Sequence, residues 1–504
     1  MSARSSLCNL KETSLRTPAT RAIPKTNYFL DPRSSTSLFE QLYRKLRDDI
    51  LAGRLQPGER LPSSRPWAAK LGVSRTTILT ALDQLRAEGY TESRQASEVR
   101  ITLSLPEDTL RRLPVRSKGA RPPAPSKPVH VNAVEWPQPR NYGVPRPFQK
   151  ALPALDAFPC RDWARLSTAI WRKPPLELLN YPRPGGYPPL RRAIAEYLGA
   201  ERGVLCEPEQ IIITAGSQQA LHLAAQLLVR PRDAVWMENP GYYAARLAFE
   251  RVGARVHPVV VDADGIDVQA GIQSAPQAAL AYVTPSHQCP LGCRLSLERR
   301  LALLHWAGSA GAWIVEDDYD SEYRYGGRPL ASLHALDEGG RVLYIGSFSL
   351  MLYPSLRIGF LVSPPALVDA FLSARALADW NSSAVDQAVL AQFIDRGLLG
   401  RHLRRMRVLY AERQQLLLTE AESLDRWLRL EKQPAGLHVV GWLQGLSEKK
   451  MMNAARLAGV ELRPMSMYRV GPAKRDAVLF GFAAFDAAAT RHAVARLRAS
   501  LSGR

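Results

Sequence analysis

Apolar residues recur at every fourth position from Leu38 through Leu42 and Leu46 to Ile50. This spacing places the four side chains on one side of an α-helix. Gly53 follows the pattern, and glycine commonly ends a helix because it accepts a left-handed backbone. The pattern therefore predicts a first helix with one buried face that ends before Gly53.

Two further helices are expected after this one. The shorter begins near Ser63 or Ser64, carries Pro66 in its first turn and ends at a turn on Gly72. The longer begins at Ser74. Its apolar residues share one face and are Ile78, Leu82 and Leu85. A helix, a tight turn and a second helix are typical of a DNA-reading element.

Short polar and basic side chains gather at the start of the longer helix. They are Ser74, Arg75, Thr76 and Thr77. In a helix-turn-helix the second helix enters the major groove with its N-terminus first, so these groups would reach phosphates and base edges. Backbone amides near Ser64 and Arg65, at the start of the shorter helix, would bind a DNA phosphate while the longer helix lies in the groove. The alternative for a single residue such as Ser74 is a simple helix cap.

The motif RLPSSRxxAxxLGVSRxT, with LxxxLRxxILxGRLxPG before it and LxAEGY after it, resembles the GntR-type winged helix-turn-helix over residues 36–102. The resemblance implies a two-stranded wing that usually turns on glycine and offers a basic residue to DNA. Here residues 93–98 read SRQASE, without glycine. Because glycine permits the positive φ of a tight hairpin, we expect a shorter or distorted wing with Arg94 as its DNA contact.

The chain is expected to have four parts. Residues 1–33 lack periodicity and predict a flexible arm. Residues 34–102 form the DNA-binding head. Residues 103–140 include the stretch ARPPAPSKPVHV, which predicts an extended, semi-stiff linker. Residues 141–504 are long enough for a large second domain.

Short apolar runs alternate with amphipathic helical segments in the second domain. The runs are IIITAG, AVWME, AALAYVTP, AWIVED and VLYIGSF, and the helical segments include SQQALHLAAQLLVR and SLERRLALLHWAG. This alternation predicts an α/β domain with a largely parallel sheet. Ligands bind such sheets at the carboxyl ends of the strands.

Two of these strand ends offer anion-binding groups. IIITAG leads into Ser217 and Gln218 at the start of a helix, where free amides and the helix dipole attract an anion. GSFSLMLYPSLRIG adds the hydroxyls of Ser347 and Ser349 and the planar guanidinium of Arg357. An arginine alone would be as well explained as a surface charge.

Several segments in one order resemble the fold-type I aminotransferases, and in particular the MocR-type regulators, which join a GntR head to such a body. They are FPCRDWARL, YPRPGGYPPLRRAIAEYL, ITAGSQQAL, ENPGYYAAR, YVTPSHQCPLG, VEDDYDSEYRYGGRPL and GSFSLMLYPSLRIGFL. The resemblance runs from about residue 147 to the C-terminus. It implies a multidomain fold: a winged helix-turn-helix followed by an α/β domain like the transferases that use pyridoxal 5′-phosphate, with a small C-terminal α+β subdomain.

The resemblance also assigns roles around pyridoxal 5′-phosphate. The residues expected to hold its phosphate are Gly216, Ser217, Gln218, Ser347, Ser349 and Arg357. Tyr242 would stack on the ring, and Asp317 would pair with the pyridine nitrogen and keep it protonated. Tyr319 and His287 would lie near the phenolic oxygen of the ring. Tyr181 would reach the phosphate bound by a partner subunit of a homodimer.

Position 350 departs from the family pattern. The family reads SFSK where this chain reads Ser347, Phe348, Ser349 and Leu350. A Schiff base needs a primary amine, and the same lysine moves the proton in transamination, so Leu350 removes both the covalent anchor and the general base. Residues 477–485 also lack the arginine that binds a substrate carboxylate in catalytic relatives. We therefore expect no catalytic residues.

Composition narrows the function classes. The formal net charge of +20 would attract DNA or an anionic membrane surface, and the charge alone does not choose between them. Five cysteines without a CxxC pair support neither a disulfide framework nor a zinc ribbon, so ordinary thiols and no metal are expected. The sequence contains no run of about 18 apolar residues and no apolar signal segment at its start, so we expect a cytoplasmic protein without membrane contact.

The leading hypothesis is a DNA-binding transcription regulator, a homodimer on a double-stranded operator. Its body would lack transaminase activity and would bind pyridoxal 5′-phosphate, another phosphorylated or aromatic ligand, or an amine effector without a covalent bond. One alternative is an active pyridoxal-phosphate aminotransferase, which Leu350 opposes. The other is a ligand-independent DNA-binding protein whose body serves only to dimerise.

Overall fold

A computed structural model describes residues 28–95, 98–105, 143–325, 331–472 and 475–503. The chain divides between residues 130 and 131 into two compact units. We call the first the head and the second the effector domain. The division falls inside the predicted linker, whose residues 106–140 lie outside the described part of the chain.

The described part of the head contains three helices and a two-stranded sheet. Its elements are α1 (Leu38–Leu51), α2 (Ser64–Leu71), α3 (Arg75–Ala87), β1 (Thr91–Gln95) and β2 (Glu98–Ile101). Leu46 of α1, Trp67 of α2 and Leu82 of α3 are buried in one core. Ser74 caps α3 by accepting a hydrogen bond from the backbone amide of Thr77. The three predicted helices are confirmed.

The head begins earlier than the sequence pattern indicates. Residues 28–33, which the pattern assigns to the arm, pack onto α1. Leu30 is buried in the core of the head, and the hydroxyl of Tyr28 donates a hydrogen bond to Asp49 Oδ2 at 2.6 Å. Isolated side chains such as these carry no periodicity, so the pattern could not detect them. Residues 1–27 of the predicted arm lie outside the described residues.

The wing is distorted, as its glycine-free turn predicts. β1 and β2 pair in antiparallel orientation, but their register shifts between Ser93 and Gln95. Such a shift lets one strand carry an extra residue and bends the ribbon. Residues 96–97 and the side chain of Arg94 lie outside the described residues, so a DNA contact by Arg94 stays a prediction.

The described part of the effector domain is built on an eight-stranded sheet with the order β3-β10-β9-β8-β7-β4-β5-β6. Its strands are β3 (Ile211–Thr214), β4 (Ala234–Asn239), β5 (Arg255–Asp262), β6 (Gly265–Ile266), β7 (Leu280–Val283), β8 (Trp313–Asp318), β9 (Val342–Ser347) and β10 (Gly359–Val362). Neighbours from β9 to β5 run parallel, whereas β10 and β6 are antiparallel. The predicted, largely parallel sheet is confirmed, and the carboxyl ends of the parallel strands lie along one edge.

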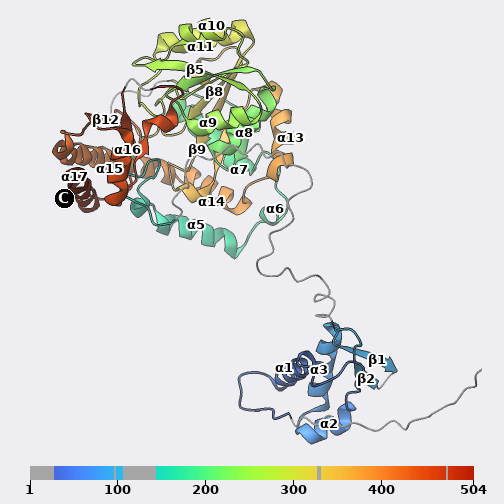
Figure 1. Ribbon diagram of the computed structural model, residues 1–504. Coiled ribbons are helices and arrows are strands. Elements are labelled where there is room, and N and C mark those ends of the chain that lie inside the picture. Colours follow the sequence, from blue (N-terminus) through green and yellow to red (C-terminus); the bar gives the residue numbers. More distant parts are fainter. Residues whose placement is uncertain (1–27, 96–97, 106–142, 326–330, 473–474, 504) are drawn as a thin grey trace, which may run out of the picture. The chain divides into compact units, whose positions relative to one another are not determined.

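Helices cover both faces of this sheet (Figure 1). They are α5 (Cys160–Arg172), α6 (Leu176–Leu179), α7 (Pro188–Arg202), α8 (Ser217–Leu228), α9 (Tyr243–Arg251), α10 (Val268–Ser274), α11 (Leu297–Ala310), α12 (Leu333–Leu336), α13 (Val368–Asp379) and α14 (Ala384–Asp395). Val235 and Met237 of β4 pack with α8, α9 and α13, whereas Trp236 packs with α10 and α11. The period of two along a strand thus builds a core on each face.

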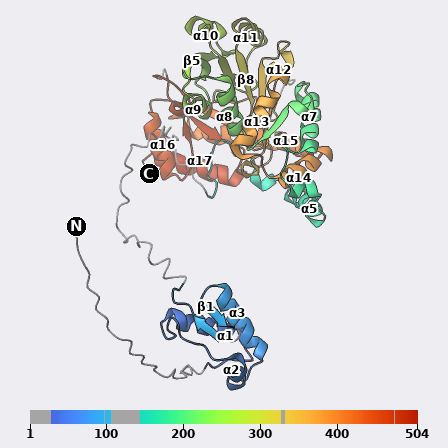
Figure 2. The same cartoon turned by 90° about the vertical axis from the view of Figure 1, so that its right-hand side faces the viewer.

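A smaller subdomain follows the main sheet. It contains the antiparallel strands β11 (Leu428–Leu430), β12 (His438–Leu443), β13 (Arg463–Pro464) and β14 (Ala477–Gly481), in the order β11-β12-β14-β13, with α15 (Leu398–Ala421), α16 (Glu448–Leu457) and α17 (Ala487–Leu501). Figure 2 shows α16 and α17 at the end of the domain that carries the C-terminus. The predicted C-terminal α+β subdomain is confirmed.

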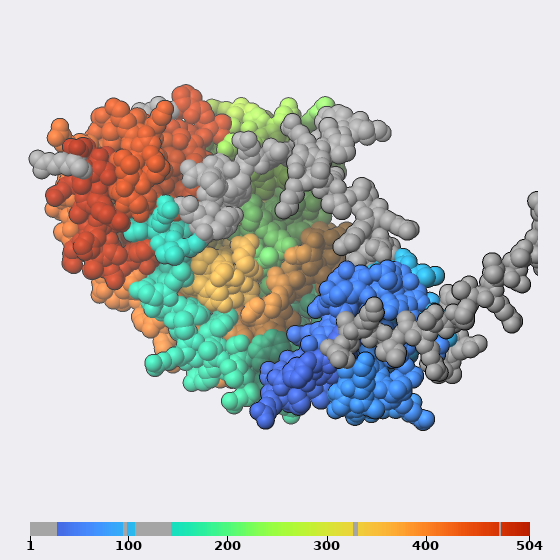
Figure 3. All heavy atoms as spheres, turned by 60° about the horizontal axis from the view of Figure 1, so that its bottom comes forward, coloured from blue at the N-terminus to red at the C-terminus, as the bar shows by residue number. Residues whose placement is uncertain are grey.

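The helices α5 and α14 pack together away from the smaller subdomain's sheet. Figure 3 shows the teal segment that contains α5 on the outer surface of the effector domain. Helix α5 is strongly amphipathic: Leu166 and Ile170 are buried, while Trp171 is exposed. Over the described ranges, no helix combines the length and the apolar character needed to cross a membrane.

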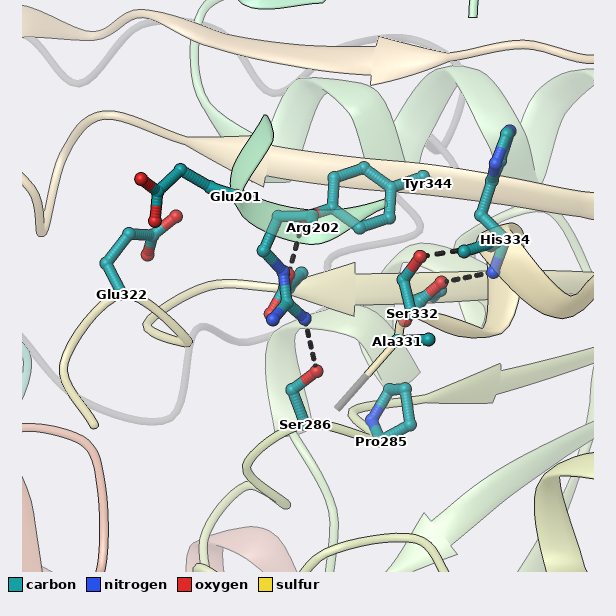
Figure 4. Close-up of polar contacts among 12 residues, drawn as sticks. Glu201, Arg202, Pro285, Ser286, Glu322, Ala331, Ser332, His334 and Tyr344 are labelled. Carbon is teal, nitrogen blue, oxygen red and sulfur yellow. Dashed lines mark hydrogen bonds and ion pairs between the residues drawn. The ribbon is translucent and has the colours of Figure 1, made fainter. Parts of the chain in front are cut away.

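Two alternate carboxylates of β8, Glu316 and Asp318, are held by hydrogen bonds on one face of the sheet. Asp318 Oδ2 accepts hydrogen bonds from Arg202 Nε at 2.8 Å and from the hydroxyl of Tyr344 at 2.5 Å. Arg202 also donates to Ser286 Oγ at 2.7 Å (Figure 4). Two residues earlier, the Glu316 carboxylate accepts hydrogen bonds from two backbone amides at the start of α12. Because side chains alternate along a strand, Asp317 between them points to the other face.

Two glycines, one in α10 and one in α11, test how closely the helices pack against the main sheet. A Cβ on Gly271 of α10 would lie 2.8 Å from ring atoms of buried Trp236, whereas a Cβ on Gly308 of α11 would meet nothing within 4 Å. Gly271→Ala should therefore lower the free energy of unfolding by about 1–3 kcal/mol through overpacking. Gly308→Ala should raise it by about 0.5–1 kcal/mol, since alanine favours helix. Urea denaturation followed by tryptophan fluorescence measures both, and equal effects would contradict the packing.

Candidate functional site

A cavity of about 190 Å³ lies at the edge of the main sheet where the parallel strands end. Its walls come from β7, β8 and β9, from the start of α8, from the loops after β4 and β7, and from the smaller subdomain. The lining residues are Lys150, Ala151, Ser217, Gln218, Tyr242, Tyr282, Cys289, Asp317, Tyr319, Asp320, Ser347, Ser349, Leu350, Pro354, Arg357, Leu437 and His438. Eight of the ten residues predicted to hold a cofactor line it.

One wall of the cavity is built for an anion. Gly216 precedes α8 with φ of +93°, and a Cβ on it would come within 3.2 Å of Arg357 Nη1. The guanidinium therefore lies against the start of the helix, beside Ser217. Ser347 accepts a hydrogen bond from the backbone amide of Ser349 at 3.2 Å, at the end of β9. Helix amides, two hydroxyls and an arginine together are the groups that bind phosphate.

Two features of this wall remain open to a ligand. Within the described residues, no carboxylate forms an ion pair with Arg357. Gln218 donates from Nε2 to the carbonyl of Ala244 at 3.1 Å, but its Oε1 is buried without a partner. Gly216 itself is absent from the lining because it lies behind Arg357. Gly216 lets the Arg357 guanidinium approach the start of α8, since a Cβ at residue 216 would press against it.

Asp317 brings a buried carboxylate into the cavity. Its Oδ2 accepts a hydrogen bond from the Tyr282 hydroxyl at 2.8 Å, and its Oδ1 is buried without a partner. Burial raises the pKa of Asp317 to about 7, with Asp318 and Asp320 adding to the rise and the Tyr282 hydrogen bond opposing it. An N–H donor with positive charge would both satisfy Oδ1 and return this pKa toward its ordinary value.

Aromatic residues flank the carboxylate. Tyr242 and Tyr319 line the cavity, and burial raises the pKa of both phenols. His287 stands behind Tyr319 and does not line the cavity, in contrast to its predicted place at the ring. Its Nδ1 lies 3.1 Å from the Tyr319 hydroxyl and 2.9 Å from Asp320 Oδ1. These two contacts make His287 a positioning partner of Tyr319.

Leu350, which the sequence predicts to match the lysine position of the family, lies in the wall of the cavity. Its side chain lines the cavity and packs against the large core of the domain. Among its described lining residues the cavity contains one lysine, Lys150, which comes from the segment that precedes the main sheet in the sequence. Its Nζ lies 3.3 Å from Cys289 Sγ and 3.4 Å from the Tyr468 hydroxyl.

Sequence reasoning missed several lining residues. Tyr282 and Cys289 lie in or after a predicted strand, so the rule that ligands bind at strand ends could have found them. Lys150 had no such signal, because it stands 139 residues before Cys289 in a segment without periodicity. Tyr181 does not line the cavity of its own subunit: its side chain is 86% exposed and contacts the ring of Trp380.

The predicted DNA-reading residues of the head come together at two helix N-termini. Arg75 Nε of α3 donates to Ser64 Oγ of α2 at 3.2 Å, which joins the two ends. Ser74, Arg75 and Thr76 are exposed, as is Arg65, while Thr77 and Ser64 are half-buried. Ser74 Oγ lies 2.8 Å from Thr77 Oγ1. The site thus presents helix amides, hydroxyls and two arginines on one surface.

Comparisons with known proteins agree with both units. Residues 38–101 match the model of bacterial regulatory proteins of the gntR family, and residues 167–497 match aminotransferase class I and II. The structure of LysN, the α-aminoadipate aminotransferase of Thermus thermophilus, was solved with N-(5′-phosphopyridoxyl)-L-leucine. It superposes with a TM-score of 0.65 and 29% identity, over 71% of this chain and 92% of its own.

Full-length relatives carry both units. The probable rhizopine catabolism regulatory protein MocR of Rhizobium meliloti is 40% identical over 94% of this chain and 95% of its own length. The pyridoxine biosynthesis transcriptional regulator PdxR of Corynebacterium glutamicum is 32% identical over 94% of this chain and 98% of its own. The chain therefore belongs to the MocR-type family of transcriptional regulators, in which a GntR-type head precedes an aminotransferase-like domain.

Proposed function

We propose that this protein regulates transcription by binding operator DNA through its head while its effector domain holds pyridoxal 5′-phosphate without a covalent bond and without transaminating. One cavity carries this proposal, because it combines an anion wall at Arg357 with a partnerless carboxylate oxygen on Asp317. The sequence prediction that Leu350 stands at the family's lysine position supports the noncovalent part. The names of the relatives as regulators support the DNA-binding function.

The lining residues fit this cofactor group by group. Pyridoxal 5′-phosphate supplies a phosphate, an aromatic pyridinium ring and an aldehyde. Arg357, Ser347 and the amides at Ser217 would bind the phosphate. Asp317 Oδ1 would accept the ring N–H, which explains why a buried oxygen lacks a protein donor. Tyr242 would cover the ring face, and its burial keeps that surface dry.

The side chain at position 350 determines which reactions are possible with the cofactor. A hydrocarbon side chain neither condenses with an aldehyde nor carries a proton between carbon atoms. The residues that remain can bind, orient and exclude water, and these are the tasks of a sensor. An effector amine that enters the cavity would change the contacts of the ligand, and a regulator needs no more than a difference in binding energy between two states.

An exposed apolar patch supports a homodimer. Leu179, Tyr181, Leu377 and Trp380 are 57%, 86%, 89% and 47% exposed. Trp380 Nε1 donates to the carbonyl of Pro182 at 2.7 Å, and the rings of Tyr181 and Trp380 contact each other, so the two segments adjoin here. Exposed apolar surface of this kind marks protein interfaces. A second copy would bury it, bring Tyr181 toward the partner's phosphate site and pair two heads on two half-sites.

Cofactor binding can be tested on the purified full-length protein. Calorimetry with pyridoxal 5′-phosphate should show saturable binding that Arg357→Ala weakens about 10- to 100-fold, because a charge-assisted contact to phosphate is lost. Arg429→Ala, an exposed arginine outside the cavity, should bind normally. After borohydride reduction, mass spectrometry should find no cofactor on a cavity lysine, whereas Leu350→Lys should carry it at residue 350. If the unmodified protein binds no cofactor, the effector domain is only a scaffold.

Asp317 predicts a pH-dependent stability. The folded protein keeps the Asp317 proton up to about pH 7, while the unfolded chain releases it near pH 4, so its contribution to ligand-free stability falls as the pH rises from about 4 to 7. Asp317→Asn cannot ionise and should be more stable than the unmodified protein at pH 8, on the order of 3 kcal/mol, with a smaller gain at pH 5. Thermal melts at both pH values measure this.

The matched control is Asp425→Asn, an exposed carboxylate, which should melt like the unmodified protein at both pH values. Pyridoxal 5′-phosphate should raise the melting temperature of the unmodified protein and leave that of Asp317→Asn unchanged. A gain from Asp317→Asn that is equal at pH 5 and pH 8 would refute the buried-carboxylate assignment, and a retained cofactor effect would refute its role at the ring nitrogen.

Arg75 tests the DNA surface. Arg75→Ala should weaken binding in gel shifts by about 10- to 100-fold on a duplex that the protein itself selects from a random library, since one base or phosphate contact contributes about 1–3 kcal/mol. Arg86→Ala, at the far end of α3 and paired with Asp83, should bind like the unmodified protein. Circular dichroism checks that both variants fold. Equal affinity of the Arg75 variant would remove the recognition-helix assignment.

A further inference from the structure

Lys150 is a cation in the cavity that the proposed cofactor contacts do not use. It belongs to a segment held firmly against the smaller subdomain. The amide of Gly481 donates to the carbonyl of Phe148, and the amide of Glu461 donates to that of Pro147, both at 2.9 Å. A Cβ on Gly481 would collide with the backbone of Gln149 at 2.1 Å. The segment therefore delivers the lysine side chain to a fixed place.

The partners of Lys150 leave its charge uncompensated. Nζ contacts Cys289 Sγ and the Tyr468 hydroxyl and lies 4.5 Å from the centre of the Tyr468 ring. Burial raises the pKa of both the Cys289 thiol and the Tyr468 phenol, so both are neutral at physiological pH. Lys150 therefore has two hydrogen-bond partners in the cavity, and neither of them is a carboxylate.

The two carboxylates that line the cavity, Asp317 and Asp320, are bonded to other side chains and not to Lys150. Both oxygens of Asp320 lie within 3.0 Å of His287 Nδ1, and Asp317 Oδ2 accepts from Tyr282. Among the residues that the structure describes, none forms an ion pair with Lys150. A cation removed from bulk water without a counter-charge is costly. Because Lys150 is only partly buried and lines the cavity, a ligand can supply the missing charge.

Phosphate is not the ligand group that Lys150 needs, because the anion wall at Arg357 and Ser217 already serves it from another part of the sheet. The smaller subdomain has no arginine in residues 477–485 to bind a carboxylate. Lys150 is carried by a segment bonded to that same strand at Gly481. The cavity thus holds two cations from different segments, Arg357 in the anion wall and Lys150 from the segment bonded to the smaller subdomain.

We propose that Lys150 binds the carboxylate of an amino-acid effector, which occupies the cavity beside the ring and phosphate sites. This inference rests on the proposed function and adds the chemical class of the effector. An amino acid carries the amine expected of an effector and the carboxylate that Lys150 lacks. The contact is an ion pair with one or two N–H···O hydrogen bonds.

Two stable conjugates test this contact by calorimetry on the full-length protein. N-(5′-phosphopyridoxyl)-L-leucine carries the carboxylate, and N-(5′-phosphopyridoxyl)-3-methylbutylamine differs only in lacking it. The unmodified protein should bind the first at least about tenfold more tightly, the expected gain from a charge-assisted contact. Lys150→Met should remove this preference and still bind the second conjugate, which shows that its cavity is intact. Lys150→Arg and the exposed-site control Lys432→Met should keep the preference.

Other results overturn the proposal in distinguishable ways. Equal binding of the two conjugates by the unmodified protein, or a preference that survives Lys150→Met, removes the carboxylate role and leaves the proposed function standing. Failure of both conjugates to bind refutes the cofactor cavity itself. Pyridoxal 5′-phosphate trapped on Lys150 by borohydride would show that Nζ condenses with the aldehyde, forming a carbon–nitrogen double bond and releasing water. Lys150 would then replace the lysine absent at position 350.

Discussion

Three ionisable groups in one cavity lack a protein counter-charge among the described residues, and the proposed binding function depends on them. Asp317 has an oxygen without a donor, and neither Arg357 nor Lys150 has a carboxylate partner. A protein retains such costly groups where a ligand completes them. A molecule with a cationic ring nitrogen, a phosphate and a carboxylate would satisfy all three at once. Under the proposed function, Leu350 would then separate binding from catalysis, since a leucine would replace the one group that reacts and leave the recognition groups in place.

Local pattern was enough to predict most of the fold. The period of four in α1, the Ser74 cap of α3 and the apolar runs of β3, β4, β7, β8 and β9 are decided by neighbouring residues, and each appears in the structure. The same holds for Ser217, Ser347 and Asp317, because they follow or end predicted strands whose carboxyl ends meet at one edge. Resemblance to the family supplied their roles, which periodicity alone does not contain.

The rest depended on contacts between distant parts of the chain. Lys150 reaches the cavity only because Phe148 and Gly481 join two segments more than three hundred residues apart. His287 was expected near the phenolic oxygen of the ring, and it contacts Tyr319 and Asp320 without lining the cavity. Leu30 joins the core of the head from a segment without periodicity. No local rule reports these positions, since each follows from which surfaces meet when the whole domain packs.

A crystal structure of the full-length protein grown with pyridoxal 5′-phosphate measures the central claim most directly. We expect the phosphate at Arg357 and Ser217, the ring nitrogen within hydrogen-bond distance of Asp317 Oδ1, and an aldehyde carbon whose electron density joins no side chain. Density continuous from that carbon to Lys150, or a cofactor that lies outside this cavity, would contradict noncovalent binding at the site.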